Sequence, residues 1–166
     1  KNYFDALNHI SVAARHKEEL TTKLVLETHE YVMRGIDIKY PGKFRNSKVI
    51  VGHHGMHGLV VKHDPPAHDV AHIKNSLNSL FDYMKSPSDI SPLIRAGILH
   101  HEVAYIHPFY DGNGRVTRLL TIYYLLLHNY EVSKYFILDD YYDIDRLEYS
   151  DKLHSADSGD KTIWLE

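Results

Sequence analysis

Two apolar segments separated by a short polar turn dominate this sequence and limit the folds open to it. Residues 92–106 and residues 115–128 carry apolar side chains on nearly all sides of a helix. A helix that is apolar all round is a central, buried helix. We therefore expect two central helices joined by a turn at 107–114, with the other elements packed around them.

The rest of the chain predicts four amphipathic helices and one β-hairpin. Apolar residues recur every three to four positions over residues 2–16, 18–34, 67–85 and 145–156. Two β-branched-rich runs flank a stretch of seven histidine- and glycine-rich residues, which predicts a hairpin with a long loop. The runs are Val49, Ile50, Val51 and Leu59, Val60, Val61. The expected fold class is all-α, a single domain over residues 1–166 with one hairpin.

Composition excludes several classes of function. The chain has 166 residues, a net charge of −3 and no run of lysine and arginine, which argues against nucleic-acid binding. Without cysteine it has neither disulfides nor a thiol nucleophile. It has no apolar run long enough to span a membrane, and a cytoplasmic location fits. Because it opens with Lys1 and stops at Glu166 inside an amphipathic segment, we expect a domain excised from a longer chain.

The turn between the two central segments has the composition of an anion-binding loop. Gly112 and Gly114 tolerate unusual backbone angles and let a ligand approach closely. The helix after them begins with unpaired N–H groups and the positive end of its dipole. The pattern predicts a phosphate site, although a plain loop with Asn113 as the helix cap fits the glycines equally well.

Charged residues around the glycines favour the phosphate interpretation. Arg115 and Arg118 share one helix face where their charge opposes the helix dipole, which indicates an anion such as a triphosphate or an acidic side chain. Asp111 is a hard oxygen ligand suited to Mg²⁺ beside phosphates, or the residue of an Asx turn. Because His107 precedes Pro108, it should end the helix, and a neutral imidazole there can act as a general base.

The same residues carry a resemblance to a known family. The stretch from His107 to Arg118 resembles the Fic signature H-x-F-x-[DE]-G-N-G-R-x-x-R and fills every fixed position of it. The resemblance implies a Fic-like helical domain that acts as a protein adenylyltransferase. Such an enzyme transfers AMP from ATP to a Ser, Thr or Tyr hydroxyl of a target protein and releases pyrophosphate.

The resemblance also implies a role for each residue of the signature. His107 would be catalytic and would deprotonate the target hydroxyl, while Asp111 would hold Mg²⁺ between the α- and β-phosphates. The nucleotide phosphates would bind to Gly112, Asn113, Gly114, Arg115 and Arg118. Phe109 is expected to anchor the turn in the core.

Segments outside the signature resemble the family as well. Residues 41–45 resemble a turn with the pattern G-x-F-R, and residues 48–62 resemble a flap that docks a target segment by adding a strand. A hairpin that merely covers the core remains the alternative. Arg146 and Tyr149 resemble residues on the adenine side of the nucleotide, where Ser150 replaces a second tyrosine.

Several alternatives stay open at this point. The chain could transfer another phosphate-containing group such as UMP or phosphocholine, remove AMP, or bind a nucleotide without catalysis. Many Fic enzymes are held off by a helix with the pattern [ST]-x-x-x-E-[GN], and the complete pattern does not occur here. We therefore expect an inhibitory helix to act from upstream in cis, or in trans. The expected partner is a target protein with an accessible hydroxyl, with neither nucleic acid nor membrane, and a homo-oligomer stays open.

Overall fold

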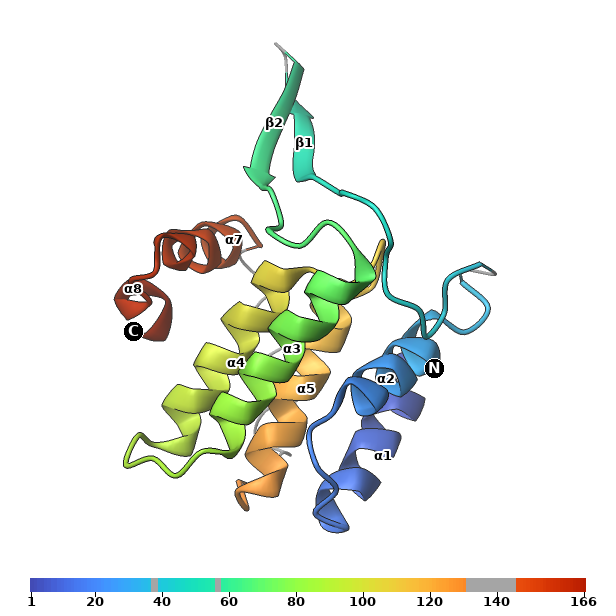
Figure 1. The fold of residues 1–166 in the computed structure, drawn as a ribbon, viewed down its shortest axis with the longest axis vertical. Coiled ribbons are helices and arrows are strands. Elements are labelled where there is room, and N and C mark those ends of the chain that lie inside the picture. The colour runs from blue at the N-terminus through green and yellow to red at the C-terminus, as the bar shows by residue number, and fades with distance from the viewer. Residues whose placement is uncertain (37–38, 56–57, 131–145) are drawn as a thin grey trace.

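Two helices, α4 and α5, form the centre of the fold. In the computed structural model, which describes residues 1–36, 39–55, 58–130 and 146–166, α4 spans Pro92–Ile106 and α5 spans Asn113–Leu127. Helix α5 packs against α4 and against α1 (Asn2–Arg15) and α2 (Thr22–Met33), whereas α3 (Val70–Lys85) packs on α4 (Figure 1). The predicted central helix pair and the mostly helical fold are therefore confirmed.

The two central helices differ in how completely they are buried. Helix α5 places Val116, Leu119 and Leu120 in the core with no exposed surface. In α4, Leu93 and Ile94 are exposed in the first turn, whereas the polar His100 further along is buried. An apolar pattern on all sides therefore predicted a central helix correctly, but it did not show which turn of the helix lacks neighbours.

Side-chain caps decide where several helices begin. The Thr21 hydroxyl accepts a hydrogen bond from the Leu24 N–H, so α2 begins at Thr22 and not at the expected residue 18. Asp69 caps α3 through the His72 N–H in the same way. Ser91 caps α4, with a proline at the first helical position.

The hairpin extends from one end of the helices (Figure 1). Strand β1 (Val51–Gly55) pairs antiparallel with β2 (Gly58–His63), and a bulge follows Val51. The predicted strand limits were therefore wrong, because Val49 and Ile50 precede β1 and most of the expected loop is strand. Gly58 has a φ of +119°, an angle that glycine adopts readily, and it pairs with Gly55 at the start of β2.

The C-terminal part lies beside α4 (Figure 1). It contains α7 (Arg146–Ser155), the 3₁₀ turn η2 (Ala156–Ser158) and the short helix α8 (Thr162–Leu165). The Trp164 indole N–H donates to the Gly97 carbonyl of α4 at 2.8 Å, which attaches α8 to the central pair. Over the described ranges, every helix is too short or too polar to cross a membrane.

Candidate active site

His107 stands where α4 ends and the signature turn begins. Helix α4 stops at Ile106, as the following proline predicted, but His107 adopts left-handed angles (φ 50°, ψ 64°) and not extended ones. Its N–H still donates to the Val103 carbonyl at 3.1 Å. A left-handed conformation costs a residue with a side chain about 1–2 kcal/mol, so other contacts must stabilise the turn.

Arg45 supplies those contacts from the segment before the hairpin. Its fully buried guanidinium donates to the carbonyl oxygens of His107 (2.6 Å) and Ile106 (3.2 Å). The third guanidinium bond goes to the Ser47 carbonyl at 2.9 Å, and the Arg45 backbone N–H donates to Pro108 at 3.0 Å. Arg45 thus satisfies carbonyl groups that the end of α4 leaves without helical partners. The G-x-F-R pattern included this residue but did not predict its positioning role.

The His107 ring is held in its neutral form. Burial first, and then the nearby His63 and Arg45, lower its pKa to about 4, although a hydrogen bond with the Ala104 backbone acts in the opposite direction. At neutral pH the ring is therefore unprotonated and has a nitrogen lone pair that can accept a proton. These are the properties of a general base.

Two internal hydrogen bonds hold the turn in its shape. The Asn113 side chain accepts from the Phe109 N–H and donates to the Phe109 carbonyl, both at 2.9 Å. Asn113 is the first residue of α5 and is buried, so its amide is a clamp within the turn and not the helix cap that the glycine pattern allowed. The contribution that Asn113 can still offer to a ligand is its backbone N–H.

A stacked pair of rings anchors the turn to α2. Phe109 is fully buried, as predicted, and its ring stacks on His29 with centroids 3.7 Å apart. The His29 Nδ1 accepts from the Gly42 N–H at 3.0 Å, so Nε2 carries the proton and donates to the Asp111 carbonyl at 3.1 Å. His29 was not predicted from the sequence, although its place between Val25 and Val32 on the buried face of a helix was an available signal.

The start of α5 has the features of an anion site. Gly112 is its N-cap with a φ of +79°, and the helix begins two residues earlier than predicted. The backbone N–H groups of the first turn have no partners within the helix. The N–H of the N-cap Gly112 donates to the Asp111 carboxylate at 2.6 Å. Gly114 is exposed, and an ideal Cβ on it would lie 3.5 Å from the Arg118 guanidinium. A ligand can therefore approach the backbone beside that cation.

The charged side chains of the turn lie close to one another. Arg115 lies 3.5 Å from the Asp111 carboxylate and 3.4 Å from the Met33 sulfur. Asp111 is exposed and uses one oxygen for the Gly112 N–H, so its second oxygen faces only Arg115 among these contacts. Mg²⁺ commonly binds to one or two carboxylates together with phosphate oxygens of a substrate, and an exposed carboxylate beside an anion site offers this combination. Asp111 therefore fits the implied metal.

Behind the turn, Tyr149 reaches the central helices. Its hydroxyl lies 2.8 Å from His100 Nε2, and His100 Nδ1 lies 3.0 Å from the Thr121 hydroxyl. Burial first, and then the charge of Arg118, lower the pKa of His100 to about 3. The Arg146 side chain lies outside the described residues, so an adenine-side role for Arg146 and Tyr149 stays a prediction.

The flap residues are partly accessible. Val60 and Val61 on β2 are 43% and 50% exposed, and Ile50 just before β1 is also exposed. Val49 and Val51 are half-buried, and the Leu59 side chain lies outside the described residues. An exposed strand can receive a further strand through its main chain, so the exposed part of β2 is compatible with target docking.

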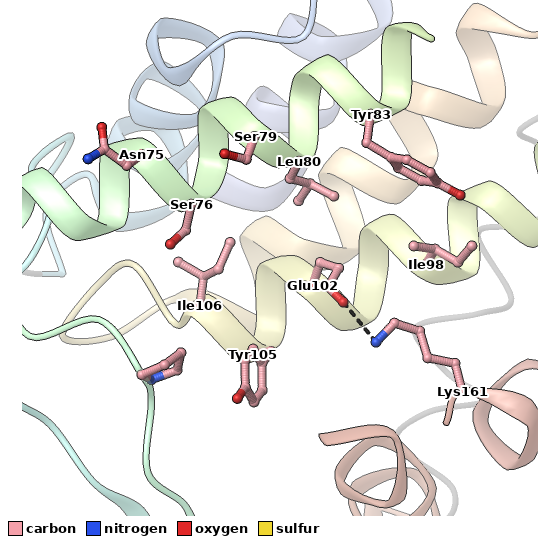
Figure 2. A pocket seen from close by; sticks show the side chains of 11 residues that line it. Asn75, Ser76, Ser79, Leu80, Tyr83, Ile98, Glu102, Tyr105, Ile106 and Lys161 are labelled. Atoms are coloured by element: carbon pink, nitrogen blue, oxygen red, sulfur yellow. Dashed lines mark ion pairs between the residues drawn. The ribbon is translucent and has the colours of Figure 1, made fainter. Parts of the chain in front are cut away.

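A separate cavity lies between α3 and α4 and reaches the last turn of α4, at Tyr105 and Ile106 (Figure 2). It has a volume of about 700 Å³, and Ser76 and Leu80 of α3 face Ile98 and Tyr105 of α4 across it. Among the described residues that line it, none belongs to 107–118. The groups capable of phosphate chemistry converge at the turn, which is therefore the candidate active site.

Comparison with known proteins identifies the family. The model of the Fic/DOC family matches residues 19–125. The chain therefore belongs to the Fic/DOC family, as the resemblance predicted. The protein adenylyltransferase Fic of Drosophila willistoni is 34% identical over 118 residues, and that of Drosophila grimshawi is 33% identical over 115 residues. Each alignment covers 69% of this chain but only 21% and 22% of the two relatives, so the chain spans about a fifth of their length.

Solved structures confirm the fold. A Fic family protein from Desulfovibrio desulfuricans G20 superposes with a TM-score of 0.73 at 24% identity, over 98% of this chain and 48% of that protein chain. Fic-1 from C. elegans superposes with a TM-score of 0.71, also at 24% identity, over 99% of this chain and 44% of that one. At this identity the likeness establishes the shared architecture alone.

Proposed function

We propose that this domain transfers AMP from ATP to a hydroxyl group of a target protein. The observation that carries the proposal is the pairing of a neutral imidazole, His107, with the anion site at the start of α5. The curated relatives named protein adenylyltransferase support the same reaction. The expectation of a nucleotide substrate follows from both.

The anion site would bind the triphosphate. The N–H groups of Asn113 and Gly114 would receive phosphate oxygens, and Gly114 has no side chain to obstruct them. Arg115 would leave its resting contact with Asp111 to join Arg118 on the β- and γ-phosphates, since a polyanion attracts two guanidinium groups more strongly than one carboxylate does. Asp111 would then hold Mg²⁺, which neutralises phosphate charge when bound.

His107 would activate the acceptor. Its unprotonated nitrogen would take the proton of the target hydroxyl as the oxygen attacks the α-phosphorus of ATP. The new bond joins that oxygen to the AMP phosphorus, the bond to the β-phosphate oxygen breaks, and pyrophosphate leaves with the electron pair. Arg45 would act by positioning, because it holds the His107 and Ile106 carbonyls in place. Positioning and charge neutralisation are the main contributions in phosphoryl chemistry.

Two labelled nucleotides test the proposal. With Mg²⁺ and ATP labelled at the α-phosphate, we expect label to stay on the protein, whereas ATP labelled at the γ-phosphate leaves none. His107→Asn should abolish labelling, and it suits the site because asparagine tolerates left-handed angles. His16→Ala, at an exposed histidine at the end of α1, is the matched control and should label normally.

Several results would contradict the proposal. Equal labelling of His107→Asn and the unchanged protein would exclude His107 as the base. Label from the γ-phosphate would indicate phosphate transfer. Intact-mass spectrometry separates AMP from UMP, phosphocholine and phosphate, because each adds a different mass.

The proposed role of the hairpin needs its own test. Val61→Pro on β2 removes a main-chain N–H, and it should reduce transfer to a protein target without reducing ATP binding. Val61→Thr is the control, because threonine keeps both the N–H and the β-branched shape. An equal loss of transfer and of ATP binding would count against docking on this strand.

A further inference from the structure

A second cluster of chemically active side chains lies outside the signature turn. His63 ends β2, His154 belongs to α7 and Asp157 belongs to η2. The Nδ1 atoms of His63 and His154 lie 3.0 Å and 3.4 Å from the same carboxylate oxygen of Asp157. One ligand atom from each residue lies within 4.8 Å of the other two. Three donors from three separate elements thus converge on one point.

The hydrogen bonds of His63 show that a positive charge is needed at that point. Its Nε2 lies 2.7 Å from the Tyr105 carbonyl, and a carbonyl can only accept, so Nε2 carries the proton. In a neutral ring Nδ1 then directs a lone pair at the Asp157 oxygen. Two electron-rich atoms at this distance require a positive charge between or beside them. A metal ion or an additional proton would supply it.

The surroundings of Asp157 favour the metal. Its other oxygen lies 3.0 Å from His101 Nε2. The Lys161 ammonium, which has donors only, lies 3.1 Å from His101 Nδ1 and is nearer to it than the Glu102 carboxylate at 3.5 Å. The nitrogen Nδ1 therefore accepts, and Nε2 donates to Asp157. Lys161 is itself held by Glu102 at 2.8 Å (Figure 2). Such an outer layer, which orients the ligands and saturates their remaining atoms, is typical of metal sites.

The two distances from the Asp157 oxygen also suit a small divalent ion. A tetrahedral zinc ion with bonds of about 2.0–2.2 Å places its ligand atoms roughly 3.4 Å apart. The observed separations from the Asp157 oxygen, 3.0 Å and 3.4 Å, lie close to this value. His63 is buried, whereas His154 and Asp157 are partly exposed, so an ion could enter from solvent.

We propose that His63, His154 and Asp157 form a binding site for a divalent transition metal, with Zn²⁺ as the best fit. Two imidazoles and one carboxylate suit Zn²⁺ and its neighbours in the transition series, whereas Mg²⁺ and Ca²⁺ prefer oxygen ligands alone. The fourth position of a tetrahedral ion would be left to water. The bound ion would fasten the base of the hairpin to the C-terminal helices, and it is separate from the Mg²⁺ expected at Asp111.

Titration of the metal-free protein with Zn²⁺ tests this site. After treatment with a chelator and its removal, calorimetry should detect one tight Zn²⁺ per chain, and Co²⁺ should give the visible absorption of a tetrahedral complex. Asp157→Asn should weaken Zn²⁺ binding at least about 100-fold, since even the loss of an outer-layer partner costs about 10–100-fold. Lys161→Met should weaken it about 10-fold. Mg²⁺ should not compete.

A matched control excludes binding at other histidines. Asp69 and His72 form an exposed pair with the same kind of contact, Nδ1 to carboxylate at 2.9 Å, but with no second histidine in the described contacts. Asp69→Asn should therefore leave Zn²⁺ binding unchanged, and asparagine still caps α3. Circular dichroism checks that each variant folds, and His154→Gln, at a residue that is partly exposed like Asp157, replaces Asp157→Asn if that variant does not fold.

Three results would overturn the proposal. One is the absence of tight Zn²⁺ binding to the unchanged protein. Another is equal affinity in the protein with and without Asp157→Asn or His154→Gln, which would show adventitious binding elsewhere. The last is a nuclear magnetic resonance spectrum in which His63 keeps protons on both nitrogens in excess Zn²⁺, which would show a simple imidazolium–carboxylate pair. None of these readouts depends on adenylyl transfer.

Discussion

Replacing Asn113 by alanine should destabilise the whole domain. The substitution removes two hydrogen bonds and leaves the Phe109 N–H and carbonyl without their partner at a position where Asn113 is only 6% exposed. Each bond contributes about 1 kcal/mol net, and each buried group left unpaired costs about 1–3 kcal/mol. Allowing for overlap between these effects and for the better helix propensity of alanine, we expect a loss of about 2–4 kcal/mol.

Urea unfolding followed by circular dichroism measures this loss directly. The midpoint should fall while the slope stays constant, because the surface exposed on unfolding hardly changes. In a thermal experiment the same loss corresponds to a fall in Tm of roughly 5–12 °C for a chain of this size.

Asn78→Ala is the matched control for this experiment. Asn78 is exposed in the middle of α3, so the same substitution there removes no buried contact. Alanine at that position should stabilise the protein by a few tenths of a kcal/mol, through helix propensity. A free energy of unfolding for Asn113→Ala within about 0.5 kcal/mol of that of the unchanged protein would refute the reasoning. It would show that the two hydrogen bonds of Asn113 do not stabilise the turn and that leaving the Phe109 backbone groups unpaired has no large cost.

Three further predictions concern the groups around the turn. Gly112→Ala should lower the free energy of unfolding by about 1–2 kcal/mol for the left-handed angle, and by more because its Cβ would lie 2.9 Å from the Met33 sulfur. Gly35→Ala, at a similar φ but in open space, should show only the first loss in urea unfolding. Equal losses in the two variants would contradict the contact with Met33. Arg45→Lys should lower the free energy of unfolding by about 3 kcal/mol or more, because one ammonium cannot replace the guanidinium bonds to three separate carbonyls. A Tm lowered by less than about 3 °C would count against this expectation. The pKa of His100 is about 3 in the folded protein and about 6.5 when unfolded, so the unfolded state binds more protons between these values and stability falls as pH decreases through that window. From pH 7 to pH 5 the unchanged protein should lose about 2 kcal/mol more than His100→Gln does, and parallel pH profiles of the two would refute the assignment.

Local sequence was sufficient to predict helices α1 to α5 and α7, although not where α2 and α5 begin, and to identify the signature residues. The end of α4 at Ile106 was predictable because Pro108 restricts the residue before it. The buried anchor Phe109 was predicted as the apolar residue that attaches the turn to the core. These features depend on residues adjacent in the chain, and local chemistry determines them.

The contacts that shape the site could not be predicted in the same way. Arg45 and His107 lie 62 positions apart, and His63 and Asp157 lie 94 positions apart. Nothing in the spacing of residues along the chain indicates that such pairs meet. The strand limits failed for a related reason, since the register of a hairpin depends on its turn and its bulge, and not only on the β propensity of each run.

The dependence of the turn on His29 and Arg45 limits how the signature can be transplanted. Both residues precede the hairpin, yet they hold the backbone of Asp111 and His107 from outside the twelve-residue stretch. A graft of that stretch alone onto another pair of helices would bring the reactive groups without the scaffold that orients them. A minimal engineered version of this site would therefore have to import α2 and the segment that follows it.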